Sequence, residues 1–365
     1  MATATSPTRG DAALQQQIRF CRGAGGVRLA YASHGQGPPL LVVSCWLSHL
    51  QYDWQSPVWR HFLDDLGAIT TLIRYDERGF GLSDWTVDDF SLEARVADLE
   101  AIVEAVGLER VSLMGVSGSA AVAMTYAARH PDRVERLIIY GGYARGPGRD
   151  ANERELAFRA MIQAGWAQAD PMFRRVFTTS YIPDATDEQM GWFDELQRMS
   201  TSTENALASR VERLAVDVTS ELPRIQAPTL FLHAREDRLC TLDGPREAAS
   251  LIPNARLVIL ESPNHILLAS EPAWRAFMAE IGAFMNVGSS SAVRDHRTIE
   301  NLSSREREIL ALAAEGRTNA EIAGELVLSA RTVERHLSNV YLKLGISGRA
   351  ARAAAVASLI RQDSA

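Results

Sequence analysis

The chain has 365 residues, of which 46% are hydrophobic and 23% charged, and its formal net charge is −7. This composition is typical of a globular protein with one large and one small domain. Its three cysteines are far apart and lack metal-ligand spacing, which argues against a disulfide framework and a zinc site. No apolar run approaches the ~18 residues that span a bilayer, and the N-terminus lacks a signal-peptide core. We expect a cytoplasmic protein without metal, cofactor or membrane contact.

The charge is divided unevenly along the chain. Residues 292–365 contain 11 basic and 9 acidic residues, whereas residues 1–291 contain 27 basic and 36 acidic residues. An acidic body with a mildly basic tail indicates that any contact with a polyanion belongs to the tail.

The first part of the chain alternates strand and helix patterns. Two short alternating runs, Gln17–Cys21 and Val27–Ser33, flank a Gly-rich stretch and predict a hairpin. Continuous apolar runs predict buried strands, and a helix is expected over Leu92–Val106, with Gly107 as its stop signal. The strands are Leu40–Ser44, Ile69–Arg74, a run that starts at Val111, and Arg136–Tyr140. This order predicts an α/β fold with a doubly wound, mostly parallel sheet.

Residues 143–222 break this alternation. They contain helical patterns, six aromatic residues from Trp166 to Phe193 and no convincing strand, so we expect a helical insertion. The strands resume at Pro228–His233 and Arg256–Leu260.

Ser117 stands at a corner between a strand and a helix. Gly115 and Ser119, two residues before and after it, are small, as a strained strand-to-helix elbow requires. The helix N-terminus beneath the hydroxyl favours a developing negative charge. Taken alone, the segment is also consistent with a Gly/Ser turn that has no chemical role.

Gly115-Val116-Ser117-Gly118-Ser119 resembles the G-x-S-x-G nucleophile elbow of the α/β-hydrolase family, with Ser119 in place of the last Gly. Asp76 to Ser83 resembles the D-x-R-G-x-G-x-S turn of the same family, and we interpret it as structural. The resemblance implies an α/β-hydrolase-like fold with residues 143–222 as a cap over the active site. It also implies an oxyanion hole formed by the backbone N–H groups of Trp46 and Gly118. Ser44-Cys45-Trp46 here replaces the family's frequent His-Gly-x sequence.

Asp237 and His265 follow the two later strands, so the chain order is Ser, Asp, His, with each residue in a loop after a strand. In the family that order belongs to the catalytic triad. The resemblance implies Ser117 as nucleophile, His265 as general base and acid, and Asp237 as the carboxylate that orients the imidazole. Glu236 is the alternative acid, and a buried structural histidine is the alternative for His265.

The composition changes after the body. Met285 to Ala292 is a Gly/Ser stretch, and we place a hydrolase-like domain at residues 16–286, a linker at 287–298 and a small all-α domain at 299–365. Ser303 and Glu306 have capping-box spacing at the start of a first helix, which ends near Gly316. Further helices are expected over 319–326 and 330–344.

The third helix of this domain has two distinct stripes. One stripe is apolar and suits packing: Val333, Leu337, Val340 and Leu344. The other suits phosphate and base-edge contacts in a major groove: Thr332, Arg335, His336, Asn339 and Lys343. A solvated polar face on an ordinary helical bundle is the alternative.

Residues 302–350 resemble the LuxR-type helix-turn-helix domain throughout, from Leu302-Ser303-Ser304-Arg305-Glu306 to Tyr341-Leu342-Lys343-Leu344-Gly345. The resemblance implies binding to double-stranded operator DNA through the third helix. The expected DNA-binding residues are Arg331, Thr332, Val333, Arg335, His336, Asn339 and Lys343. In the family the final helix, here the Ala-rich Arg349–Ile360, mediates dimerisation, so we expect a homodimer.

Two functions from different classes remain open. The first is a DNA-binding transcription regulator whose hydrolase-like domain senses a small hydrophobic ligand, with or without slow hydrolysis. The second is an active serine hydrolase, cleaving an ester, a lactone or a C–C bond, with an accessory DNA-binding tail. The fold alone does not decide between them. Measurements of how turnover and DNA binding depend on Ser117 would decide between the two functions.

Overall fold

The computed structural model describes residues 16–43, 45–148, 153–286, 304–314, 316–326 and 328–343. The chain divides into two compact units, Met1–Met285 and Asn286–Ala365. Three parts of the sequence-based expectations lie outside the described residues: the linker at 287–298, Ser303 of the predicted capping box, and the final helix at 349–360.

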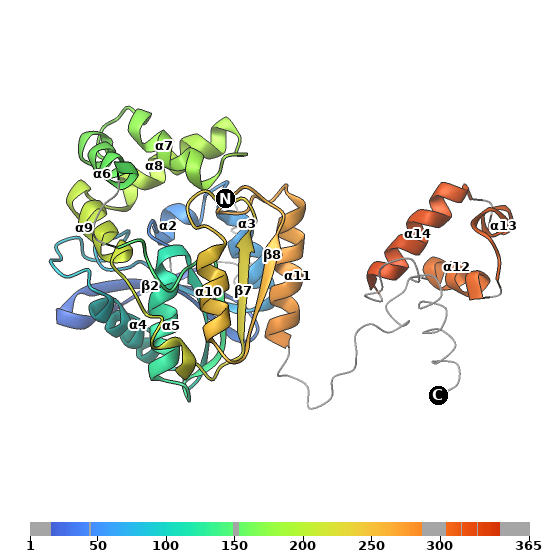
Figure 1. Ribbon diagram of the computed structural model, residues 1–365, viewed down its shortest axis with the longest axis horizontal. Coiled ribbons are helices and arrows are strands. Elements are labelled where there is room, and N and C mark those ends of the chain that lie inside the picture. Colours follow the sequence, from blue (N-terminus) through green and yellow to red (C-terminus); the bar gives the residue numbers. More distant parts are fainter. Residues whose placement is uncertain are drawn as a thin grey trace, which may run out of the picture. The chain divides into compact units, whose positions relative to one another are not determined.

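Among the described residues of the first unit, eight strands form one sheet with the spatial order β1-β2-β4-β3-β5-β6-β7-β8 (Figure 1). β2 pairs antiparallel with β1 and with β4, and the remaining neighbours pair in parallel. The strands are β1 (Gln17–Arg22), β2 (Arg28–Gly35), β3 (Pro39–Val43), β4 (Thr71–Tyr75), β5 (Val111–Val116), β6 (Val134–Tyr140), β7 (Thr229–Ala234) and β8 (Ala255–Leu260). The predicted doubly wound, mostly parallel sheet is confirmed.

Helices cover both faces of this sheet because alternate residues of its strands point to opposite sides. Leu40 belongs to the buried cluster that includes residues of α3 and α11, whereas its neighbour Leu41 belongs to the cluster that includes residues of α4, α5 and α10. Strands buried on both faces read as continuous apolar runs, which is why they were visible in the sequence. These helices are α3 (Arg60–Ile69), α4 (Leu92–Val106), α5 (Ala120–Arg129), α10 (Asp243–Leu251) and α11 (Pro272–Asn286).

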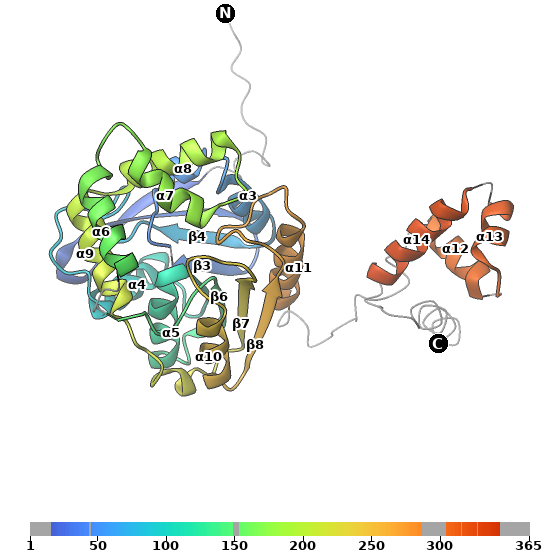
Figure 2. The same ribbon diagram turned by 45° about the horizontal axis from the view of Figure 1, so that its top comes forward.

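Four helices between β6 and β7 lie together at one end of the sheet (Figures 1 and 2). They are α6 (Glu153–Gly165), α7 (Met172–Tyr181), α8 (Asp187–Ser200) and α9 (Thr203–Leu214). Buried aromatic residues of α7 and α8, Phe177 and Phe193, and Trp166 just after α6 join the same buried cluster as Leu40 of the sheet. We call these four helices the cap.

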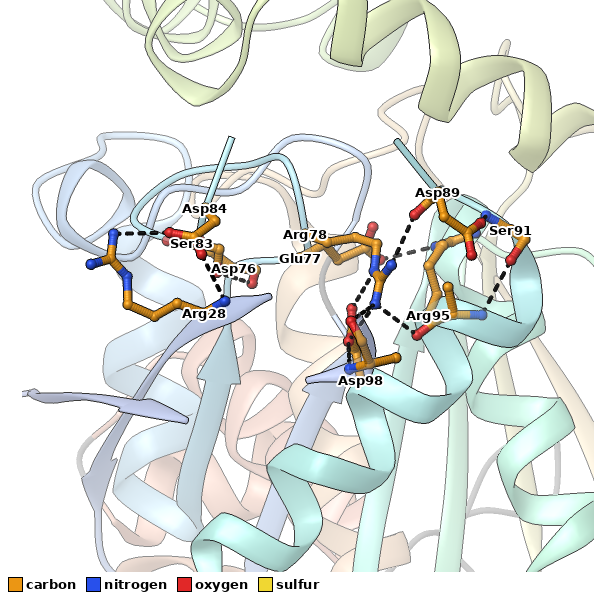
Figure 3. Close-up of polar contacts among 12 residues, drawn as sticks. Arg28, Asp76, Glu77, Arg78, Ser83, Asp84, Asp89, Ser91, Arg95 and Asp98 are labelled. Carbon is orange, nitrogen blue, oxygen red and sulfur yellow. Dashed lines mark hydrogen bonds and ion pairs between the residues drawn. The ribbon is translucent and has the colours of Figure 1, made fainter. Parts of the chain in front are cut away.

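The turn after β4 is held by buried ionic and hydrogen bonds (Figure 3). The Arg78 guanidinium donates to both carboxylate oxygens of Asp98 on α4, at 2.6 and 2.7 Å. It also donates to the carbonyls of Ala24, Asp89 and Ala94. The carboxylate of Asp76 accepts from the backbone N–H groups of Leu50 and Leu82, so it closes the turn and joins it to the segment that begins at Leu50.

We expect Arg78→Met to lower the free energy of unfolding by roughly 3–5 kcal/mol, because it leaves the buried Asp98 carboxylate without its cation. The Arg78–Asp98 side chains are only 4% and 1% exposed. Arg28→Met is the matched control, since Arg28 pairs with Asp84 at 57% and 38% exposure (Figure 3) and should cost under about 1 kcal/mol. Urea unfolding followed by tryptophan fluorescence measures both variants. Equal losses would contradict this account of the turn.

The described part of the second unit contains α12 (Ser304–Ala314), α13 (Asn319–Glu325) and α14 (Ala330–Lys343). Apolar side chains from all three helices form one core: Ile309, Ala313, Ile322, Ala323, Val333 and Leu337. Thr318 caps α13 in a reciprocal capping box with Glu321, which sequence reading had overlooked. Within the described parts of both units, none of the helices has the length and apolar character that a bilayer-spanning segment requires.

Candidate active site and DNA-binding helix

Ser117 lies on a strained corner between β5 and α5. Its φ of 54° is the only positive φ at a non-glycine residue among the described residues. A Cβ on Gly115 would lie 2.8 Å from the Cα of Ala120, and one on Gly142 would lie 2.3 Å from the Cβ of Ala120. Both positions therefore require glycine for α5 to pack this closely, and the geometry is that of a nucleophile elbow.

Asp237 and His265 lie in contact at the ends of β7 and β8. His265 Nδ1 is 2.6 Å from Asp237 Oδ2, and the other carboxylate oxygen accepts from the backbone N–H groups of Leu239 and Cys240. Burial acts to raise the pKa of Asp237, but His265 and these N–H donors outweigh it and lower the pKa below its usual value. The carboxylate is thus ionised and fixes the histidine ring. Glu236 is exposed and has no such contact among the described hydrogen bonds.

Cys240 is a third buried side chain close to Asp237 and His265, and the sequence alone did not single it out. The nearby Ser117 hydroxyl acts to lower the pKa of the thiol, but burial outweighs it and raises the pKa well above its usual value. Among the hydrogen bonds of the described residues, none joins Ser117 to His265. The hydroxyl therefore has to turn toward His265 before the imidazole can take its proton. In the sequence, the only feature that could have pointed to Cys240 is its position three residues after Asp237.

Replacing Cys240 with Ala should increase the reactivity of Ser117 toward an alkyl fluorophosphonate by about fivefold, since the thiol then no longer competes with His265 for the hydroxyl, and one weak hydrogen bond is worth ~1 kcal/mol. The second-order labelling rate measures this effect. Cys21→Ala on β1 is the control and should leave the rate unchanged. Slower labelling of Cys240→Ala would show instead that the thiol assists the hydroxyl.

The three side chains of Asp237, Cys240 and His265 also form the one candidate metal group in the described part of the chain. Their ligand atoms all lie within 4.8 Å of one another. A metal would need the thiolate form of Cys240, which the raised pKa of this thiol disfavours. The metal would also compete with the contact between Asp237 and His265. The arrangement suits proton transfer better than metal binding.

A cavity of about 630 Å³ opens beside Ser117. Trp46 and Gly118, the two residues expected to supply the oxyanion hole, line it together with Ser117. The cap contributes apolar and aromatic surface through Phe158 and Tyr181. Arg210 and Arg213 of α9 also line the cavity, and sequence reading missed both, because only the fold brings α9 to the elbow.

A buried charge network lies next to this cavity. Glu77, in the turn shown in Figure 3, accepts hydrogen bonds from Ser119 at 2.8 Å and from Arg95 at 3.3 Å, and it pairs with Arg213. Burial acts to raise the pKa of Glu77, but the two guanidinium groups and the Ser119 hydroxyl lower it overall. The network connects the elbow, α4 and the cap helix α9.

The structure places all seven expected DNA-binding residues on α14. Arg331 is exposed, and Thr332 and His336 are partly exposed. The side chains of Arg335, Asn339 and Lys343 lie outside the described residues. Val333 is wholly buried in the three-helix core, so its prediction as a DNA contact is wrong. Its place on the apolar stripe already indicated packing.

Comparison with known proteins agrees with both units. Residues 38–272 match the family model of the alpha/beta hydrolase fold, and residues 300–356 match that of bacterial regulatory proteins of the luxR family. The AB hydrolase superfamily protein YisY of Bacillus subtilis (strain 168) is 26% identical over 237 residues, which are 63% of this chain and 86% of that protein.

Solved structures show the same fold for the first unit. An esterase from Exiguobacterium antarcticum superposes with a TM-score of 0.61 at 20% identity, over 73% of this chain and 98% of that one. The meta-cleavage product hydrolase CumD from Pseudomonas fluorescens gives 0.60 at 21% identity, over 74% and 97%. The chain belongs to the α/β hydrolase fold family and carries, at its C-terminal end, a helix-turn-helix domain of the luxR family of bacterial regulatory proteins.

Proposed function

We propose that this protein is a transcription regulator that binds operator DNA through α14 and senses a small ligand in the cavity beside Ser117. The observation that carries the proposal is the covalent union of a helix-turn-helix domain with a pocket-forming hydrolase fold. A hydrolase acting only as an enzyme has no need of a DNA-binding module. Operator DNA as partner implies that the protein works in the cytoplasm.

A homodimer is part of this proposal. Operators read by helix-turn-helix proteins are commonly paired half-sites, and a dimer presents two recognition helices at the required spacing. Analytical ultracentrifugation with operator DNA should give two chains per DNA duplex, and one chain per duplex would remove the dimer from the proposal.

The cavity also supports slow hydrolysis of the sensed ligand. In the proposed reaction Ser117 attacks a carbonyl, His265 takes its proton, and Asp237 holds the imidazole in the required tautomer. The backbone N–H groups of Trp46 and Gly118 receive the oxyanion. His265 then returns the proton to the leaving group, and water releases the acyl group from Ser117 by the same steps.

An active serine hydrolase with an accessory tail is the second candidate. The retained set of Ser117, Asp237 and His265 favours it, because a pure sensor could lose these residues. The similar esterase and meta-cleavage product hydrolase are enzymes by their names. An ester, a lactone or an activated C–C bond is then the substrate class.

Two parallel measurements on the purified full-length protein separate these functions. The first is electrophoretic mobility on the DNA upstream of its own gene, against a scrambled duplex. The second is turnover of a short-chain aryl ester by the wild type and by Ser117→Ala. Specific DNA binding with slow turnover supports the regulator. Rapid Ser117-dependent turnover without specific binding would favour the hydrolase.

A further inference from the structure

We propose that the cavity beside Ser117 selects ligands that carry a carboxylate in addition to an apolar portion, and that Arg210 binds this carboxylate. The inference rests on the proposed function in one respect: it concerns the ligand of the same cavity. It narrows the expected hydrophobic ligand to an amphipathic anion.

The first line of evidence is the local charge balance. The Glu155 carboxylate is shared by two arginines, with Arg210 at 2.6–3.1 Å and Arg159 at 3.0 Å. Glu77 is shared in the same way by Arg95 and Arg213. Of these groups, only Arg210, Arg213 and Glu155 line the cavity itself. The inner lining thus carries two guanidinium groups and one carboxylate, and its net charge is positive.

The exposed mouth of the cavity does not cancel this surplus. Arg145 there pairs with Glu247 and Asp217, and Asp243 pairs with Arg246. Among the residues that line the mouth, Arg145 and Arg154 offset Asp243 and Glu247, and these exposed groups are screened by solvent. The surplus of positive charge therefore lies in the inner part of the cavity, although residues 1–291 are acidic overall.

Arg213 is the second line of evidence. It is 4% exposed and lines the cavity, and two of its nitrogens donate to Glu77 and to the carbonyl of Ser209. Its Nε is buried without a hydrogen-bond partner, as is Nε of the neighbouring Arg95. Burial and the Arg95 charge both lower the pKa of Arg213. An anion in the cavity would stabilise these under-solvated cations.

Arg210 has the geometry to receive the anion. Its guanidinium lies over the rings of Trp46 and Phe158, with the carbon 5.3 and 5.1 Å from the ring centroids. Nε and Nη2 of Arg210 bond to Glu155, and no hydrogen bond of Nη1 is among those of the described residues, so Nη1 is the donor available to a ligand carboxylate. The same rings offer apolar surface to the remainder of the ligand, within the cavity that Ser117 lines.

The test uses two esters with acyl chains of equal length, 4-methylumbelliferyl hemiadipate and 4-methylumbelliferyl hexanoate. Only the first ends in a carboxylate. We expect the full-length protein to prefer the hemiadipate in kcat/KM by at least tenfold. Arg210→Gln should reduce this preference at least tenfold, and Arg210→Lys should reduce it less. The Arg210 variants leave Glu155 paired with Arg159, so no carboxylate is left isolated.

Arg198→Gln is the matched control. Arg198 is another cap arginine paired with a glutamate, Glu195, but it does not line the cavity, so the preference should remain. Glu155→Gln should increase the preference by removing a competing carboxylate. Equal kcat/KM for the two esters in the wild type, or equal losses in Arg198→Gln and Arg210→Gln, would overturn the proposal.

Calorimetric binding of both esters to Ser117→Ala separates this proposal from hydrolysis itself. Selective, Arg210-dependent binding of the hemiadipate supports the carboxylate site even where the wild type turns over neither ester. Turnover of both esters without selectivity would overturn the carboxylate site and leave the serine chemistry intact.

Discussion

Replacing Ser117 with Ala should lower kcat/KM for a short-chain aryl ester at least ~10⁴-fold, because the other members of a triad contribute little once the nucleophile is lost. The positive φ of Ser117 and the contact between Asp237 and His265 motivate this expectation. Initial rates of chromophore release measure it. DNA affinity should stay unchanged, since the substitution removes one oxygen from the first unit.

Ser180→Ala is the control for this experiment. Ser180 lies on the cap helix α7, and its hydroxyl bonds to the carbonyl of Val176. Its loss should leave turnover unaffected. If Ser117→Ala retained most of the activity, the elbow would be a structural turn and the observed turnover would arise elsewhere.

The double substitution of Arg335 and Asn339 by Ala should weaken binding to operator DNA by roughly 10²–10⁴-fold, because each base-edge contact is worth about 1–3 kcal/mol. Both residues lie on α14, one turn apart on the stripe opposite Val333 and Val340. Fluorescence anisotropy with a labelled operator at fixed salt measures the loss. Wild-type affinity should also fall steeply as salt rises, through counterion release.

Arg307→Ala provides the comparison within the same unit. Arg307 is exposed on α12, away from the recognition helix, and its loss should change affinity only slightly. The double variant should retain its helical circular dichroism, because alanine favours a helix and neither position belongs to the apolar stripe of the sequence. Unchanged operator affinity would remove α14 as the DNA-reading element.

Most of the fold was predictable because its signals are local. Buried strands read as apolar runs, Gly107 marks the end of α4 with a φ of 76°, and Ser117 sits between the small residues that an elbow needs. The parallel sheet then follows from the order of strands and helices. The grouping of Ser117, Asp237 and His265 was expected from the resemblance, and it remains a proposal as a catalytic triad.

The ligand-facing part of the site could not be predicted in this way. Arg210 and Arg213 lie on a cap helix about 90 residues after Ser117, and their approach to the elbow depends on tertiary packing. Cys240 follows Asp237 by three residues, but its place beside Ser117 in the cavity depends on how two loops meet. Val333 shows the opposite error, since a residue inside a DNA-binding motif was read as a contact although it packs in the core.

The most direct test of the account is whether occupation of Ser117 changes DNA affinity. An alkyl fluorophosphonate would attach to Ser117 of the full-length protein, and operator affinity would be measured before and after labelling by anisotropy. Ser117→Ala treated with the same reagent is the control. We expect labelling to change operator affinity at least fivefold in the wild type and not at all in the control. A fivefold change corresponds to a coupling free energy of ~1 kcal/mol between the two sites. Complete labelling with unchanged operator affinity would contradict the proposal that the hydrolase domain senses a ligand for the DNA-binding domain.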